Sequence, residues 1–196
     1  MAVVFMVRRG RFLSNIVIFL IIQLAGCDSR KQISRNGAHP DFNMVNDVMY
    51  FRQEPYTGQM FNLYPGSKDT SEIVGYLNGR EHGLWTRFYP DGKLREERQF
   101  ASGFKIGRLT AWWENGKKKL EYVFQNNEYE GTCREWNAVG RLTREMNYKK
   151  GYEEGSQKVF YDNGKVRSNY VVLNGRRYGL LGTKNCVNAS DRVFEN

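Results

Sequence analysis

The chain has 196 residues and a formal net charge of +9, from 30 basic and 21 acidic residues. Two histidines, three cysteines and no nucleophile-elbow motif argue against a metal or triad enzyme, so the sequence predicts no catalytic site, metal or cofactor. The basic excess is modest and interspersed with acidic residues, which argues against nucleic acid as a partner.

Residues 1–26 have the pattern of a lipoprotein signal peptide. A basic segment with Arg8, Arg9 and Arg11 precedes an apolar run from Phe12 to Leu24. That run of about 13 residues is too short to cross ~30 Å of hydrocarbon as a helix. The next residues, Leu24-Ala25-Gly26-Cys27, resemble a bacterial lipobox, which implies lipidation of Cys27 and a membrane-anchored protein of the cell envelope. An uncleaved signal anchor is the alternative, and the choice between inner and outer membrane stays open.

Residues 27–48 are predicted to be the lipidated cysteine followed by a flexible tether, because Ser29 to Asn46 is polar and poor in apolar residues. Residues 183–196 leave the pattern of the preceding chain and are predicted to be a short C-terminal extension. Cys133 and Cys186 fall in different units about 19 Å apart along a stacked array. We therefore expect no disulfide between them unless the C-terminal extension folds back.

Residues 49–182 are a tandem array with a period of 24 residues, preceded by a degenerate first unit from Met49 to Val74. One glycine series is Gly83, Gly107, Gly131, Gly155 and Gly179. A second series with the same step is Gly92, Gly116, Gly140 and Gly164. Such a short fixed period is typical of a repeat architecture in which each unit packs on its neighbours.

Each unit is predicted to be a β-hairpin around a two-residue turn such as Asp91-Gly92, with φ > 0 at both turn residues. This turn places Arg87 opposite Glu96, and the same offset pairs Ala111 with Leu120, Glu135 with Arg144, and Val159 with Ser168. The first pair is cation–anion, the second is apolar and the third is anion–cation, as expected of directly opposed residues. The register is therefore predicted by the sequence.

The fold class is all-β: about five and a half hairpin repeats of 24 residues forming one elongated, twisted antiparallel sheet. One face is expected to carry Trp85, Leu109 and Cys133, and the other an aromatic row beside a glutamate row. The aromatic row is Phe88, Trp112, Trp136 and Phe160, and the glutamate row is Glu97, Glu121 and Glu145. We interpret both rows as structural, because regular repetition is what a stacked sheet requires.

The segment Asn78–Phe100 follows the pattern NGxxxGxWxxFYPDGKLxxExxF. This pattern resembles the variant MORN repeat of bacterial antitoxin-like proteins, and the similarity extends over roughly residues 49–182. Gln157 in place of Trp85 and Asn137 in place of an aromatic residue depart from it. The resemblance implies hairpin repeats used for binding, sometimes as the antitoxin partner of a toxin.

A partner is expected to contact positions that vary between units, in the loops by which the chain enters each repeat at the edge opposite the Asp-Gly turns. These candidate residues are Arg80, His82, Phe104, Glu128, Glu130, Tyr152, Glu154, Arg176 and Tyr178.

The predicted function is a membrane-anchored lipoprotein acting as a non-catalytic protein-binding repeat module, with the membrane and an envelope protein as partners. The alternative is an immunity or antitoxin lipoprotein that neutralises a cognate toxin, and an envelope hydrolase ranks last. Lys93, Lys117, Arg141 and Lys165 form a row of cations, one after each Asp-Gly-type turn. We interpret this row as ordinary solvent-exposed turn residues and not as a binding site.

Overall fold

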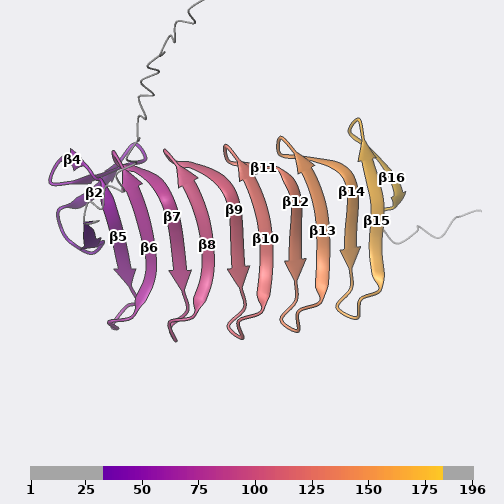
Figure 1. The fold of residues 1–196 in the computed structure, drawn as a ribbon, viewed down its shortest axis with the longest axis horizontal. Coiled ribbons are helices and arrows are strands. Elements are labelled where there is room, and N and C mark those ends of the chain that lie inside the picture. The colour runs from indigo at the N-terminus through magenta and orange to yellow at the C-terminus, as the bar shows by residue number, and fades with distance from the viewer. Residues whose placement is uncertain (1–32, 183–196) are drawn as a thin grey trace, which may run out of the picture. The chain divides into compact units, whose positions relative to one another are not determined.

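A computed structural model describes residues 33–182, and every helix or strand element within this range is a β-strand. The main sheet has 13 strands, and its neighbours follow one another along the chain (Figure 1). Its path is β1 (Ser34–Asn36), β5 (Gly58–Leu63), β6 (Thr70–Leu77), β7 (Arg80–Phe88), β8 (Leu94–Ala101), β9 (Phe104–Trp112), β10 (Lys118–Gln125), β12 (Gly131–Trp136), β13 (Leu142–Lys149), β14 (Tyr152–Phe160), β15 (Val166–Leu173) and β16 (Arg176–Leu180), with β11 (Glu128–Tyr129) pairing with β10. The predicted fold class is confirmed. No helix within residues 33–182 is long and apolar enough to span a membrane.

The predicted register is confirmed by all four test pairs. Arg87 pairs with Glu96, Ala111 with Leu120, Glu135 with Arg144 and Val159 with Ser168. The opposed charges, however, do not all form ion pairs with each other. Arg87 binds Glu72 of the preceding strand at 3.2 Å, whereas Arg144 and Glu135 do meet, at 3.5 Å.

The Asp-Gly turns, by contrast, are not two-residue loops, so that prediction was wrong. Tyr89 N–H donates to Lys93 O at 2.8 Å and Gly92 N–H donates to Tyr89 O at 2.9 Å, which leaves Pro90, Asp91 and Gly92 as a three-residue loop. Only Gly92 has φ > 0, at 80°, as expected for a turn closed by one left-handed residue. The Asp91 carboxylate accepts from Lys93 N–H at 3.0 Å instead, because Asp fixes such a turn through its own backbone.

A one-residue bulge restores the predicted register. Beyond the three-residue loop Phe88 pairs with Leu94, and the next pair is Arg87 with Glu96, so Arg95 is the extra residue. The longer loop and the bulge together shift the pairing by the same amount as a two-residue loop. Each of the later hairpins repeats this shift, with extra residues Lys119, Thr143 and Arg167.

Two-residue turns with φ > 0 at both positions occur at the opposite edge. In the turn Asn78-Gly79 the φ values are 51° and 77°, and Leu77 pairs with Arg80 across it. Ser102-Gly103, Asn126-Asn127, Lys150-Gly151 and Asn174-Gly175 have the same signs of φ. The two-residue turn with φ > 0 at both residues was predicted at Asp91-Gly92 and its equivalents. It occurs instead at the opposite edge of the sheet, where Asn and Gly also occupy the two turn positions.

The predicted flexible tether is partly folded, so its C-terminal boundary requires correction. Residues 34–36 form β1, which pairs parallel with β5. A second, three-stranded sheet is formed by β2 (Phe42–Val45), β3 (Val48–Phe51) and β4 (Glu54–Pro55). Aromatic packing accounts for this order, because the ring of Phe42 lies 4.8 Å from Phe51 and 4.9 Å from Tyr56. Tyr56 in turn belongs to a buried cluster with Met60, Val74 and Tyr76.

The buried side chains of the repeat array lie on one face of the sheet, which we call the groove face. Trp85, Leu109 and Cys133 share this face, as predicted, because they pair with Arg98, Tyr122 and Met146 respectively. Buried residues of this face include Phe100, Leu109, Phe124, Cys133, Gln157 and Tyr170. An antiparallel sheet commonly buries side chains on one face and leaves the other, here called the open face, exposed to solvent.

The tyrosines of the groove face make folding sensitive to alkaline pH. Burial, followed by the charges of Glu81 and Glu72, raises the pKa of Tyr76 to about 12. Burial and a hydrogen bond to Glu135 raise the pKa of Tyr122. A pKa that is higher in the folded chain contributes stability below the unfolded value of ~10, and this stability is lost as pH rises through the folded pKa. We therefore expect the free energy of unfolding, measured with urea, to fall between about pH 10 and about pH 12. A smaller fall is expected for Tyr122→Phe, and an equal fall would contradict the assignment to Tyr122.

Candidate functional site

The nine predicted partner-binding residues lie at one edge of the sheet, which we call the entry edge. They occupy the first residues of β7, β9, β14 and β16, together with β11 and the residue after it, rather than loops as predicted (Figure 1). The loops themselves are only the two-residue turns between Leu77 and Arg80 and their equivalents. Two-residue turns leave no room for long insertions, so the variable side chains are presented from strand backbone.

Apolar and charged side chains alternate along the entry edge. Tyr152 is 80% exposed, Tyr178 is 53% exposed and Phe104 is 50% exposed. Arg80, His82, Glu128, Glu154 and Arg176 are also exposed, whereas Glu130 is half-buried. Glu130 has a local structural role, because its carboxylate accepts from Lys150 N–H at 2.9 Å. The structure therefore brings the predicted residues to one edge and leaves eight of the nine exposed.

The cation row at the other edge, which carries the Asp-Gly turns, is engaged locally. Lys93 Nζ lies 2.6 Å from the Asp91 carboxylate. Lys117 Nζ donates to Val139 O at 2.9 Å, and Arg141 donates to Asp162 O at 3.1 Å. Two of these side chains thus link one turn to the turn of the next repeat.

The glutamate row of the open face also forms ion pairs. Glu121 binds Lys118 at 2.8 Å and Arg108 at 3.2 Å, and Glu145 binds Arg134 at 2.8 Å. Lys118 lies 5.3 Å above the Trp136 ring of the aromatic row. Within residues 33–182 no three His, Cys, Asp or Glu side chains cluster as a metal site would require.

A second surface follows the groove face beside the Asp-Gly turns. There an aromatic side chain in each of three successive units donates to a backbone carbonyl of the next unit. The Tyr64 hydroxyl donates to Phe88 O at 2.6 Å, and the Tyr89 hydroxyl donates to Trp112 O at 2.8 Å. Trp113 Nε1 donates to Trp136 O at 3.0 Å. These bonds hold the rings in fixed positions along the array.

The bulge residues place cations over these rings. Lys119 Nζ lies 4.4 Å from the centre of the Trp113 ring. The guanidinium of Arg95 lies 5.8 Å from the Tyr89 ring, and that of Arg167 lies 6.0 Å from the Tyr161 ring. A bulge re-aims the side chain of its extra residue, which explains why the cation turns toward the aromatic residue beside it.

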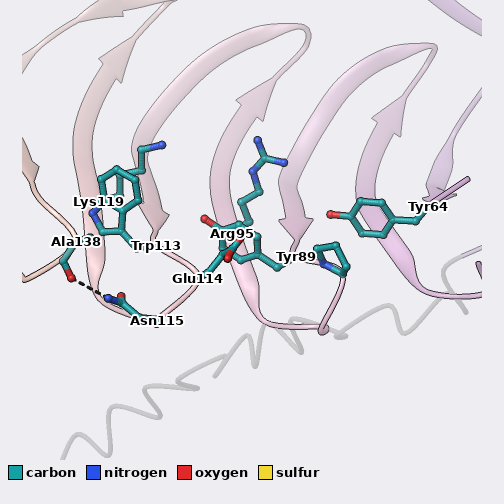
Figure 2. A pocket seen from close by; sticks show the side chains of 9 residues that line it. Tyr64, Tyr89, Arg95, Trp113, Glu114, Asn115, Lys119 and Ala138 are labelled. Carbon is teal, nitrogen blue, oxygen red and sulfur yellow. Dashed lines mark hydrogen bonds between the residues drawn. The ribbon is translucent and has the colours of Figure 1, made fainter.

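Two neighbouring hollows lie along these residues and share Trp113 and Lys119. The first, of about 680 Å³, is bordered by Tyr64, Tyr89, Pro90, Arg95, Trp113, Glu114, Asn115, Lys119 and Ala138 (Figure 2). The second, of about 420 Å³, continues past Lys119 to Asn137, Thr143, Arg144 and Arg167. We call the two together the aromatic groove. In Figure 2 the side chains of Arg95 and Lys119 rise from neighbouring hairpins on the same side of the sheet.

Sequence reasoning did not identify the aromatic groove. The signal was present, because Arg95, Lys119 and Arg167 recur at the 24-residue period, interrupted by Thr143 in the third repeat. If side chains alternated strictly along the strand, Arg95, Lys119 and Arg167 would lie on the face of the sheet opposite to that of Tyr89. Only the bulge brings them to the aromatic side.

Comparison with known families agrees with this repeat geometry. The MORN repeat variant matches residues 81–101 and 153–170. The first match includes β7 and β8, and the second includes most of β14 and the start of β15, so both fall on hairpins of the array. These matches support a MORN-repeat protein and confirm the predicted resemblance at the level of the repeat.

More distant similarities are weak. Two solved structures of TarM align with TM-scores of 0.31 at 18% and 19% sequence identity. One of them is a variant of the S. aureus protein in complex with fondaparinux, α-GlcNAc-glycerol and UDP. Each alignment covers 50% of this chain, which spans about a fifth of the TarM chains. No curated protein matches the chain.

The third and fourth MORN-type repeats depart from the first at the Trp85 position. Cys133 stands there in the third repeat, buried and without a disulfide partner within residues 33–182, and burial raises the pKa of its thiol. Beside it lies a hollow of about 200 Å³ that Tyr122, Tyr129 and Tyr148 help to line. Cys186, considered as a partner for Cys133, lies outside the described residues, as do Cys27 and residues 1–26. In the fourth repeat the position is filled by Gln157, which is fully buried.

Proposed function

We propose that this chain is a membrane-anchored lipoprotein whose MORN-type repeats form a non-catalytic protein-binding module in the cell envelope. Two sequence features support the anchor, the basic and apolar segment up to Leu24 and the lipobox-like residues ending at Cys27. The MORN repeat match supports the binding module. The membrane contact is made through the lipid on Cys27, and neither nucleic acid nor a cofactor takes part.

The observation that carries the protein-binding role is the exposure of Phe104, Tyr152 and Tyr178 along a single edge among charged residues of both signs. Aromatic residues at the centre of an interface contribute much of its binding energy, and mixed charges around them select the partner. Within residues 33–182 the rings of Phe104, Tyr152 and Tyr178 take part in no aromatic pair, whereas Trp85 and Tyr129 pack against neighbouring rings of the array. A protein surface with complementary mixed charge fits the entry edge better than a uniformly anionic membrane.

The narrower role of an immunity or antitoxin lipoprotein would use the same edge for one cognate toxin. It is supported by the resemblance to antitoxin-like MORN proteins alone. The identity of the captured protein distinguishes the two roles, because a general envelope module captures a resident envelope protein and an antitoxin captures a toxin.

The test is capture from detergent-solubilised envelopes by the full-length chain. Glu128→Lys combined with Glu154→Lys is expected to weaken capture roughly tenfold or more, since opposed like charges at an interface cost several kcal/mol. Glu130 is left unchanged because its carboxylate bonds to Lys150 N–H. The readout is the amount of each bound protein, measured by mass spectrometry as a function of bait concentration.

The matched control is a charge reversal at the other edge, Lys93→Glu combined with Lys165→Glu. This control should leave capture within about twofold of the parent chain, and both pairs should keep its melting temperature, because exposed substitutions change stability by about 0.5 kcal/mol or less. If the control abolishes capture and the Glu128/Glu154 variant does not, the entry edge is not the partner site.

A further inference from the structure

We propose that the aromatic groove binds an acidic polysaccharide that lies across the strands, with one carboxylate at each bulge cation. This ligand is distinct from the protein partner of the entry edge, and the site lies beside the Asp-Gly turns at the opposite ends of the strands. The inference does not depend on the proposed function, because it uses different residues and a different class of ligand.

The first reason is that the groove cations lack carboxylate partners, in contrast to other cations of the groove face. Arg87 pairs with Glu72, Arg144 with Glu135 and Arg177 with Glu153, and Arg98 pairs with Glu96. Within residues 33–182, no ion pair involves Arg95, Lys119 or Arg167. A cation held near a surface hollow without a counterion within the chain is available for an external anion.

The second reason is that these cations are already oriented. Lys119 lies over Trp113, and Trp113 is itself fixed by its hydrogen bond to Trp136 O. Arg95 lies over Tyr89, which is fixed by its bond to Trp112 O. A long cationic side chain loses conformational freedom when it binds an anion, and a side chain that is already positioned loses less.

The third reason is continuity across repeats. The two hollows share Trp113 and Lys119 and together extend from Tyr64 in the degenerate opening unit to Arg167 in the fourth repeat after it. Each repeat advances by two strands, or about 9–10 Å. A linear polymer with regularly spaced charges can therefore contact several repeats at once, and each further contact adds to affinity through effective concentration.

Spacing and lining favour a polysaccharide over an acidic peptide. In an extended peptide the side chains on one side recur about every 6.6–6.8 Å, which does not match the step of one repeat, about 9–10 Å, between Arg95 and Lys119. A peptide crossing the face would also find no strand edge with which to pair its backbone. An alternating polysaccharide carries one carboxylate for every two sugar rings, and the uncharged ring between them can lie on the aromatic and amide side chains of Trp113, Asn115 and Asn137.

Four residues mark where the groove falls short of a uniform cationic row. Glu114 places a carboxylate in the first hollow, Glu135 and Asp162 place carboxylates in the second, and Thr143 occupies the bulge position of the third repeat. Glu135 is paired with Arg144 and Asp162 accepts from Asn137, so the two gain-of-binding variants are made at Glu114 and Thr143. Glu114→Gln should remove repulsion, and Thr143→Lys should complete the series.

The experiment measures binding of the full-length chain to hyaluronate, which has one carboxylate per disaccharide, by isothermal titration calorimetry in low salt and detergent. We expect saturable binding that Lys119→Gln combined with Arg167→Gln weakens roughly tenfold or more, equivalent to about 1.4 kcal/mol. Glu114→Gln and Thr143→Lys should each tighten it. Added salt should weaken binding, because exposed ion pairs are screened.

The control for charge removal is Lys93→Gln combined with Lys165→Gln, which lowers the net charge equally at the turns outside the groove. Equal weakening by this control would overturn the proposal, because binding would then follow net charge alone. Poly-L-glutamate and uncharged dextran test the ligand class. Equal or tighter binding of poly-L-glutamate would mean that the groove takes an acidic peptide, and absence of hyaluronate binding would mean that it takes no such polysaccharide. Either result overturns the proposal.

Discussion

Replacing Gln157 by Leu is expected to destabilise the sheet by about 2–4 kcal/mol, because it leaves two or more buried backbone groups unpaired. Gln157 is 0% exposed. Its Oε1 accepts from Asn147 N–H at 3.0 Å, and its Nε2 donates to Asn147 O at 2.8 Å and to Glu154 O at 3.2 Å. Leu has a similar volume but no polar atoms, so the substitution removes these bonds without opening a large cavity. Urea unfolding monitored by tryptophan fluorescence measures the loss.

The reason for this sensitivity lies in the pairing of β13 with β14. The register shifts between Met146 and Tyr148, so Asn147 has no partner residue on β14. The amide of Gln157 takes the place of the missing backbone partner, which is why an amide side chain is tolerated in a position that Trp85, Leu109 and Cys133 occupy in earlier repeats. Gln125→Leu is the matched control, since Gln125 is exposed at the end of β10, and it should change stability by about 0.5 kcal/mol or less. If both variants unfold at the same urea concentration, Gln157 does not stabilise the shifted register.

Gln157 also shows how far sequence alone could reach. The 24-residue period identified its position as the one that Trp85 occupies and identified Gln157 as a departure. The period could not reveal that its side chain would replace a backbone hydrogen bond, because that depends on where the two strands change register. Local composition gives no sign of such a shift.

At the hairpin turns the predicted strand register is correct although the predicted type of turn is wrong. A two-residue loop at Asp91-Gly92 and the observed three-residue loop with a bulge at Arg95 give the same pairing of Arg87 with Glu96. Charge complementarity between repeats therefore fixed the register without fixing the path of the turn. The bulge mattered for the candidate sites, because it brings Arg95 over Tyr89 and so creates the aromatic groove.

The predicted entry edge needed only the topology of successive hairpins, and the structure places all its residues there. The sequence alone did not show which of these residues stabilise the repeat array and which do not. Glu130 was selected because it varies between repeats, yet it bonds to Lys150 N–H of the next turn. Variation among repeats therefore does not by itself identify a partner contact, because a variable residue such as Glu130 can also stabilise an individual turn.

The largest functional effect is expected for Cys27→Ser, which should abolish lipidation and leave the precursor uncleaved at this site. A serine cannot form the thioether to which the diacylglyceryl group is attached in a lipoprotein, so the signal peptide should stay uncleaved at this site. One acyl chain gives only marginal, reversible membrane binding, whereas two or more hold a protein stably. Metabolic labelling with a fatty acid measures lipidation, and the size of the chain on a denaturing gel of the membrane fraction measures cleavage.

Cys133→Ser is the control for this experiment, because Cys133 is buried in the sheet at 3% exposure and is not accessible to an acyltransferase. It should keep full labelling and full membrane association. Labelled fatty acid in Cys27→Ser would contradict the lipoprotein proposal directly. Loss of label with the uncleaved chain still in the membrane would fit a lipoprotein precursor held by its apolar segment from Phe12 to Leu24. Cleavage of that variant at the same site would instead indicate an ordinary secretory signal peptide, because a lipoprotein is cut only after its cysteine is modified.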